Sequence, residues 1–137
     1  MRHALNCSPA PIFCNQVEYH PFLSQDPVLD FCEENNIALV AYCPLARGRV
    51  LEDETLQEIG RSHDKTPAQV ALRWLIQQPY VAAIPRSSSE AHIRENAEIF
   101  DFELSVEEMD RIFDLQDPTG RIVTDEKIPI PVPDWDT

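Results

Sequence analysis

The stretch that decides the fold is Tyr80-Val81-Ala82-Ala83-Ile84-Pro85-Arg86-Ser87-Ser88-Ser89, in which an apolar run passes directly into cationic and hydroxyl side chains. The β-branched and small residues predict a short buried strand, and a helix follows almost at once. The turn between them aims backbone N–H groups and the positive end of a helix dipole at the carboxyl end of the strand. Arg86 and the serines add donors, which indicates a seat for an anion. A serine-capped helix beside a solvated arginine is the plain alternative.

Two strands with their helices precede this turn. Residues 12–19 predict the first strand, and Ser24 or Asp26 can cap a helix that has Pro27 in its first turn. Residues 37–42 predict a fully buried second strand, because the run is apolar throughout. A loop and a short helix around residues 55–61 come next.

Capping boxes mark the starts of two further helices. Thr66-Pro67-Ala68-Gln69 combines a capping box with proline at the first helical position. Ser105 and Glu108 form the second box. The apolar residues expected to face inward from that last helix are Val106, Met109, Ile112 and Phe113.

Buried strands joined by helices predict a parallel sheet with right-handed crossovers. Ligands of such sheets gather at the carboxyl ends of the strands, here residues 16–20, 42–45 and 84–87. These ends offer an amide in Gln16, a flat ring in Tyr42 and a cation in Arg86, a combination that suits a nicotinamide dinucleotide. A polar rim residue, a core aromatic and a solvated cation are the plain alternatives.

The amino-acid composition limits the class of protein and the partners that it can bind. The 137 residues are 43% hydrophobic, as in one ordinary globular domain, and they carry a net charge of −13. This acidic balance opposes nucleic acid binding, so any phosphate site has to be local. With no apolar run of membrane-span length and no signal-peptide pattern, we expect a soluble cytoplasmic protein without membrane contact.

The cysteines do not indicate a disulfide framework or a zinc site. Cys7, Cys14, Cys32 and Cys43 contain no CxxC pair, and three of the four fall inside apolar segments. Reduced, buried thiols are the usual occupants of such positions.

Over nearly its whole length the sequence resembles the aldo-keto reductases. The matching motifs, in family order and spacing, are residues 15–21, 41–45, 65–74, 84–87, 95–96 and 100–105. The glycine fingerprint of other dinucleotide folds is absent, since Gly48, Gly60 and Gly120 lie far apart. The family does not use that fingerprint, because it binds NADP(H) on a TIM (β/α)8 barrel. The resemblance therefore implies an α/β barrel fold and the NADPH-dependent reduction of aldehydes or ketones.

The resemblance implies a nicotinamide end of the cofactor site. Gln16 matches the glutamine that bonds the nicotinamide carboxamide, and Tyr42 matches the tyrosine that stacks on the ring. Cys43, where many members have serine, and Leu45 match the loop beside the pyrophosphate.

An adenosine end is implied as well. Arg86 and Ser87 match the residues that hold the 2'-phosphate, with Ser88 next to them in the same turn. Glu95 and Asn96 match residues that contact the adenine.

His92 departs from the family pattern, because many members carry a second arginine there. A neutral imidazole is a poorer phosphate partner than a guanidinium. Losing one charge-assisted bond is worth roughly 1.5 to 3 kcal/mol, or about one to two decades of preference. We therefore predict that a complete enzyme with this chain uses NADPH and also accepts NADH.

The catalytic tyrosine, lysine, aspartate and histidine of the family lie upstream of the motifs matched here, so we predict no catalytic residue in this chain. The motifs correspond to barrel strands 6 to 8 with their helices, in residues 1–115, followed by a Pro- and Asp-rich C-terminal loop or tail in residues 116–137. Trp135 in this tail is a candidate for the wall of the substrate pocket, or packs on the barrel.

About three of eight barrel units leave open sheet edges, which invite association. We expect the missing N-terminal barrel portion, or a second copy of the chain, to cover them. The chain alone is then an inactive, cofactor-binding fragment of a reductase for small carbonyl substrates. The alternative is a non-catalytic partial-barrel module that dimerises or binds nucleotide.

Overall fold

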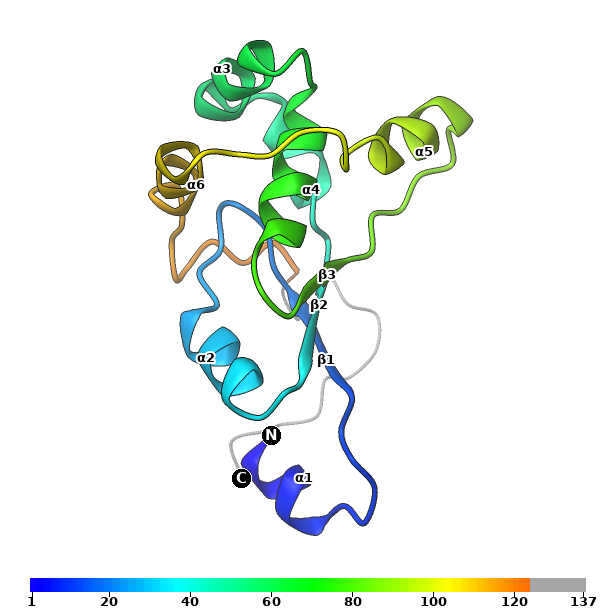
Figure 1. The fold of residues 1–137 in the computed structure, drawn as a ribbon, viewed down its shortest axis with the longest axis vertical. Coiled ribbons are helices and arrows are strands. Elements are labelled where there is room, and N and C mark those ends of the chain that lie inside the picture. Colours follow the sequence, from blue (N-terminus) through cyan, green and yellow to red (C-terminus); the bar gives the residue numbers. More distant parts are fainter. Residues whose placement is uncertain (124–137) are drawn as a thin grey trace.

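A computed structural model of the protein describes residues 1–123 (Figure 1). Its three parallel strands form one sheet in chain order, β1 (Cys14–Glu18), β2 (Ala38–Tyr42) and β3 (Val81–Ala83). The register pairs Gln16 with Val40, Glu18 with Tyr42, and Val40 with Ala82. This arrangement confirms the predicted α/β class with a parallel sheet.

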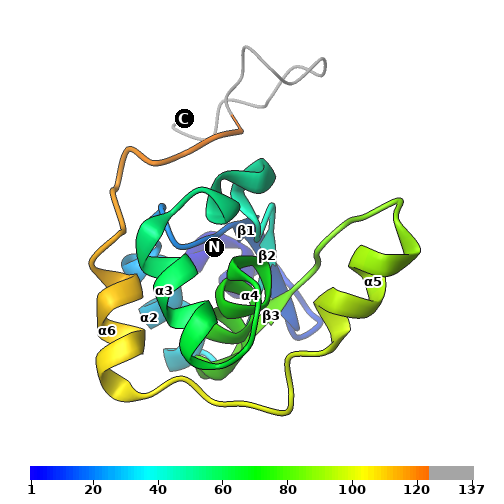
Figure 2. The same cartoon turned by 90° about the horizontal axis from the view of Figure 1, so that it is seen from above.

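Helices connect and follow the strands. They are α1 (Arg2–Cys7), α2 (Asp26–Glu34), the 3-10 helix η1 (Ala46–Leu51), α3 (Glu54–Ser62), α4 (Pro67–Gln77), α5 (Glu90–Ala97) and α6 (Val106–Phe113). Figure 2 shows α5 standing apart from the group that α3, α4 and α6 form, at the end of the connection from β3. No helix within residues 1–123 is long and apolar enough to cross a membrane.

Both predicted capping boxes are confirmed. The Thr66 hydroxyl accepts a hydrogen bond from the Gln69 backbone N–H at 3.3 Å, and the Gln69 side chain accepts one from the Thr66 N–H at 3.0 Å. Ser105 and Glu108 make the same reciprocal pair at the start of α6. The predicted cap of α2 is wrong, because Gln25 occupies the N-cap position and its buried side chain donates instead to the Glu18 carbonyl at 2.6 Å.

The core lies between one face of the sheet and the helices α2 and α4. Leu39 and Ala41 of β2 are fully buried there, together with Trp74 of α4. The Trp74 ring lies 5.2 Å, centroid to centroid, from both Tyr19 and Phe113. These aromatic contacts tie β1 and α6 to α4.

The opposite face of the sheet, which we call the open face, carries Cys14, Gln16, Val40 and Ala82. Val40 is half-buried and the other three are exposed. The prediction that the strands are buried on both faces is therefore wrong. Side chains alternate along a strand, and within residues 1–123 the helices pack on one face alone.

Two smaller predictions, one for a cysteine and one for a helix, are also wrong. Cys14 is an exposed thiol on the open face, and of the four free cysteines Cys32 alone is buried. Val106 is 73% exposed, because it is the first residue of α6 and the buried stripe begins one turn later at Met109.

Candidate cofactor site

The loop after β2 has an unusual backbone. The predicted loop with Arg47, Gly48 and Arg49 contains the 3-10 helix η1 (Ala46–Leu51), which includes left-handed residues. Positive φ angles occur at Cys43 (54°), Ala46 (48°) and Arg47 (54°), and at Gly48 (92°). Left-handed conformations in residues other than glycine cost roughly 1 to 3 kcal/mol each and cluster at binding sites and active sites. The strain therefore marks this loop as a candidate site.

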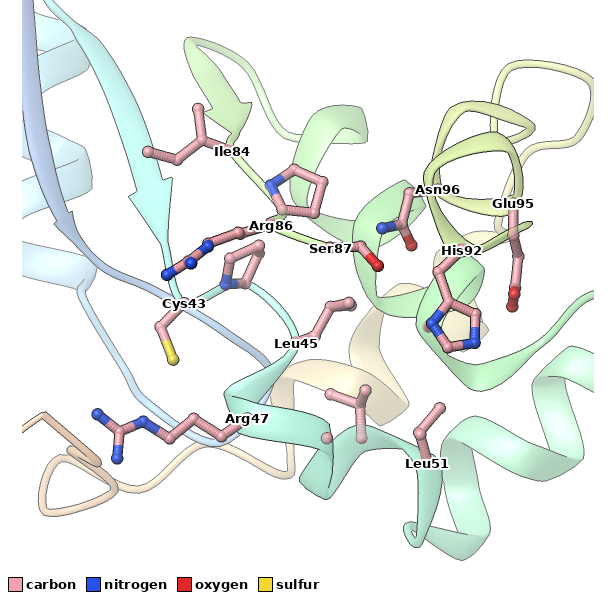
Figure 3. A pocket seen from close by; sticks show the side chains of 15 residues that line it. Cys43, Leu45, Arg47, Leu51, Ile84, Arg86, Ser87, His92, Glu95 and Asn96 are labelled. Atoms are coloured by element: carbon pink, nitrogen blue, oxygen red, sulfur yellow. The ribbon is translucent and has the colours of Figure 1, made fainter. Parts of the chain in front are cut away.

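A cavity of about 490 Å³ lies between this loop, the connection from β3, and α5 (Figure 3). Seven of the ten predicted cofactor residues line it: Cys43, Leu45, Arg86, Ser87, His92, Glu95 and Asn96. They come from two stretches that are distant in sequence, residues 43–45 and residues 86–96. The fold thus brings the predicted pyrophosphate loop and the predicted adenosine end to one cavity.

The cavity has a cationic side and a polar side. Figure 3 shows Arg86, Arg47 and Cys43 on one side of the cavity, and His92 and Asn96 across it on α5. Both arginine side chains are exposed and therefore free to meet an anion. Sequence reasoning did not single out Arg47. The signal that could have found it is a cation next to a glycine in the loop that follows a buried strand.

The wall formed by α5 is the side of that helix. His92, Glu95 and Asn96 share one helical face at spacings of three and four residues. The Ser89 hydroxyl meets the His92 backbone N–H at 3.5 Å and caps the helix itself. Of the turn predicted as an anion seat, Arg86 and Ser87 line the cavity, while the exposed Ser88 lies outside its lining.

Glu95 is anchored to the start of α4. Its carboxylate accepts a hydrogen bond from the Thr66 hydroxyl, and its backbone carbonyl accepts one from the Gln69 side chain at 3.1 Å. The capping box of α4 thus also fixes a residue of the cavity wall.

Gln16 and Tyr42 lie apart from the cavity, on the face of the sheet opposite the core. Tyr42 is the last residue of β2 and is paired in register with Glu18, which lies two residues after Gln16 in β1. Burial raises the pKa of the Tyr42 hydroxyl, the Glu18 carboxylate raises it further, and the nearby Arg121 lowers it. The phenol is therefore neutral at physiological pH and presents a flat polar ring.

The two parts together fit a nicotinamide dinucleotide. Arginine and hydroxyl donors at the cavity suit phosphate oxygens, and an aromatic ring and an amide on the same face of the sheet suit the nicotinamide. The loop that begins at Cys43, directly after Tyr42, and contains Leu45 connects the two parts. Trp135, the predicted candidate for the wall of the substrate pocket, lies outside the described residues.

Comparison with known proteins agrees with this reading. The sequence profile described as the Aldo/keto reductase family matches residues 1–117. The chain is 50% identical over 98 residues to the glyoxal reductase of Bacillus subtilis, an alignment that covers 72% of this chain and 35% of that protein. The chain spans about a third of the length of such curated relatives.

Solved structures match as well. A protein named only provisionally as 2,5-diketo-D-gluconic acid reductase B superposes with a TM-score of 0.90 at 45% identity, covering 99% of this chain and 47% of that one. A mutant of Gox0644 crystallised in complex with NADPH gives a TM-score of 0.82 at 35% identity, covering 90% and 45%. On its sequence profile and its relatives, the chain belongs to the aldo/keto reductase family.

Proposed function

We propose that this chain is the cofactor-binding portion of an NADPH-dependent aldo-keto reductase that reduces aldehydes or ketones to alcohols. The observation that carries the proposal is the gathering of seven predicted cofactor residues around one cavity. Family membership and the NADPH complex of a similar protein support it. When bound, NADPH supplies the hydride that reduces the carbonyl.

At the adenosine end, Arg86 and Ser87 hold the 2'-phosphate by charge-assisted and hydroxyl hydrogen bonds, with Ser88 at the edge. Asn96 and Glu95 contact the adenine. The anchoring of Glu95 by Thr66 supports this role, because a carboxylate held in place loses little entropy when it accepts a hydrogen bond.

At the other end, Tyr42 stacks on the nicotinamide and Gln16 bonds its carboxamide. Cys43 and Leu45 line the path of the pyrophosphate, where the strained backbone of the loop is preorganised.

The adenosine end is tested by the binding of 2',5'-ADP to the wild-type chain and to Arg86→Met. Loss of the guanidinium should weaken binding by about 10- to 100-fold, because a hydrogen bond to a charged group is worth about 1.5 to 3 kcal/mol. Arg94→Met is a matched control, since Arg94 is an exposed arginine of α5 that pairs with Glu90 and does not line the cavity. Equal losses in both variants, or no binding by the wild-type chain, would refute the proposed site.

The choice between NADPH and NADH depends on His92. We propose weak discrimination, because an exposed imidazole lines the cavity where an arginine would add a second guanidinium. His92→Arg should raise the ratio of NADPH to NADH affinity by about one to two decades. A ratio that does not change would show that His92 faces no phosphate.

We further propose that the chain supplies barrel strands 6 to 8, with the tail as the C-terminal loop, and is inactive without the rest of the barrel. The share of its relatives' length that it spans supports this proposal. So does the open face, since parallel sheets are normally covered on both faces. Reductase activity that appears only when the remaining barrel portion is added would support it. Activity of the chain alone would overturn it.

A second candidate function is a non-catalytic module that dimerises through the open face. The exposure of Cys14, Gln16 and Ala82 favours this alternative, because a second copy can supply the missing cover. Sedimentation of the wild-type chain and of Val40→Lys separates the two. A dimer that Val40→Lys dissociates, without reductase activity on addition of the rest of the barrel, would favour the module.

A further inference from the structure

Glu18, at the end of β1, is a fully buried carboxylate that sequence reasoning did not assign to any role. A buried charge is costly unless hydrogen bonds satisfy it. Its Oε1 accepts hydrogen bonds from the Ile122 N–H at 2.7 Å and the Val123 N–H at 3.2 Å, and Oε2 accepts a second one from Val123 at 3.2 Å. The His20 ring nitrogen Nε2 lies 3.3 Å from Oε1.

The donors of these bonds belong to a segment far away in sequence. Ile122 follows Glu18 by 104 residues and lies after α6, in what we call the strap, residues 120–123. Arg121 adds an ion pair, with its Nη1 3.7 Å from Oε2 of Glu18. Figure 1 shows this segment, in orange, passing from α6 toward the carboxyl ends of the strands. The carboxylate thus holds the strap over the end of the sheet.

A second contact fixes the strap from its other end. Gly120 lies so close to the turn after β1 that an added Cβ would stand 1.8 Å from the Phe22 carbonyl oxygen. The Asp117 N–H also donates to this carbonyl at 3.4 Å. The strap therefore requires both a glycine at position 120 and a carboxylate at position 18.

The place that the strap reaches is next to Tyr42. Glu18 and Tyr42 are paired in register, so their side chains stand on the same face of the sheet. Ile122 is half-buried and packs against the core, while Arg121 lies near enough to lower the pKa of Tyr42, which burial raises. A partly apolar segment is thereby held beside the ring that the proposed function places under the nicotinamide.

We propose that Glu18 is a positioning residue that holds the strap beside Tyr42, so that the strap forms a wall of the nicotinamide end of the cofactor site. The inference rests on the proposed function. Under this proposal, the Glu18 carboxylate contacts neither half of the cofactor. Binding of the nicotinamide half nevertheless depends on it, and binding of the adenosine half does not. Arg86 and the cavity residues of α5 are absent from the hydrogen bonds that Glu18 makes among the described residues.

The test measures two halves of the cofactor separately on the full chain, using reduced nicotinamide mononucleotide and 2',5'-ADP. Glu18→Gln and Gly120→Ala disturb the strap from opposite ends. Each should weaken binding of the mononucleotide by about tenfold, which is the loss expected when one well-placed contact is removed. Binding of 2',5'-ADP should change by less than about twofold. Amide hydrogen exchange at Ile122 and Val123 should accelerate by about tenfold or more in Glu18→Gln.

Glu58→Gln is the matched control for Glu18→Gln, because Glu58 is a carboxylate of α3 that pairs with Arg111 of α6 and lines neither the strap nor the cavity. This variant should leave the ratio of the two affinities unchanged.

Equal weakening of both halves would assign Glu18 a merely structural role and overturn the inference. Unchanged amide exchange, or faster exchange with intact mononucleotide binding, would overturn it as well. If the wild-type chain binds neither half, the cofactor site itself is refuted and the role of the strap falls with it. If the wild-type chain binds 2',5'-ADP but the strap variants do not change binding of the mononucleotide, the role of the strap is refuted and the proposed cofactor site is not.

Discussion

The covered face of the sheet and the open face carry side chains of different kinds. Leu39 and Ala41 on the covered face have no exposed surface, while Gln16 and Ala82 on the open face are exposed. The same three strands thus provide a hydrophobic core on one side and polar, accessible groups on the other. The covered face therefore contributes to stability, while the open face leaves Gln16, a residue of the proposed nicotinamide end, accessible, so a substitution on one face can be compared with one on the other.

The largest expected difference between the faces is in the free energy of unfolding. Trp74→Ala should destabilise the chain by about 3 to 5 kcal/mol, because it empties the volume between Tyr19 and Phe113 in the core. Val40→Ala on the open face should cost about 1 kcal/mol or less, since that side chain is only half-buried. Urea unfolding measures both. A cost for Val40 near that of Trp74 would mean that the open face is covered in solution.

A smaller difference is expected between two helix caps. Thr66→Ala should cost about 1 kcal/mol, because it removes the cap of α4 on the covered side and releases Glu95. Ser89→Ala should cost less, since its cap contact with the His92 N–H is a long one of 3.5 Å. The midpoints of urea unfolding curves that have equal slopes measure the two losses in the free energy of unfolding. Equal costs would show that α5 is held as firmly as α4.

The smallest effects concern pH. Burial lowers the pKa of His20 at the carboxyl end of the sheet below 6.5, although Glu18 opposes the shift. Because the unfolded chain then binds more protons, this group contributes stability above about pH 6.5 that is lost as pH falls through its folded pKa. His20→Gln should flatten the stability profile in that window.

The second group whose pKa affects stability is Glu108 of α6, which loses its charge in a more acidic range than His20 does. Burial raises its pKa, but the Ser105 N–H and His63 outweigh burial and leave it below 4.5. Its contribution is present above about pH 4.5 and is lost as pH falls through the folded pKa. Chemical unfolding of Glu108→Gln and His20→Gln from pH 7 to pH 3 separates the two windows. Profiles that flatten in the same window would contradict the assignment.

Local signals made part of this molecule predictable. The Thr66 and Ser105 capping boxes involve residues three apart, so the sequence contains the whole interaction. The strand ends were likewise located by apolar runs that stop at proline or at polar residues. The family motifs at residues 41–45, 84–87 and 95–96, with the departure at His92, led to seven residues of the cavity.

The features that were missed depend on distant residues. The half-burial of Val40 depends on which segments pack on each face, and an apolar run does not encode that. The bond from Gln25 to the Glu18 carbonyl displaced the expected cap of α2. The role of Glu18 itself needs a segment 104 residues away, and no local pattern around residue 18 indicates it.

The order of the strands has a topological consequence. Because β1, β2 and β3 lie side by side in the order of the chain, each edge strand of the described sheet has one unpaired side. Further strands can join at either edge without threading through existing loops, whether they come from the same polypeptide or from another. The sheet is thus suited to assembly from separate pieces, and splitting or permuting such a protein between units leaves these three strands intact.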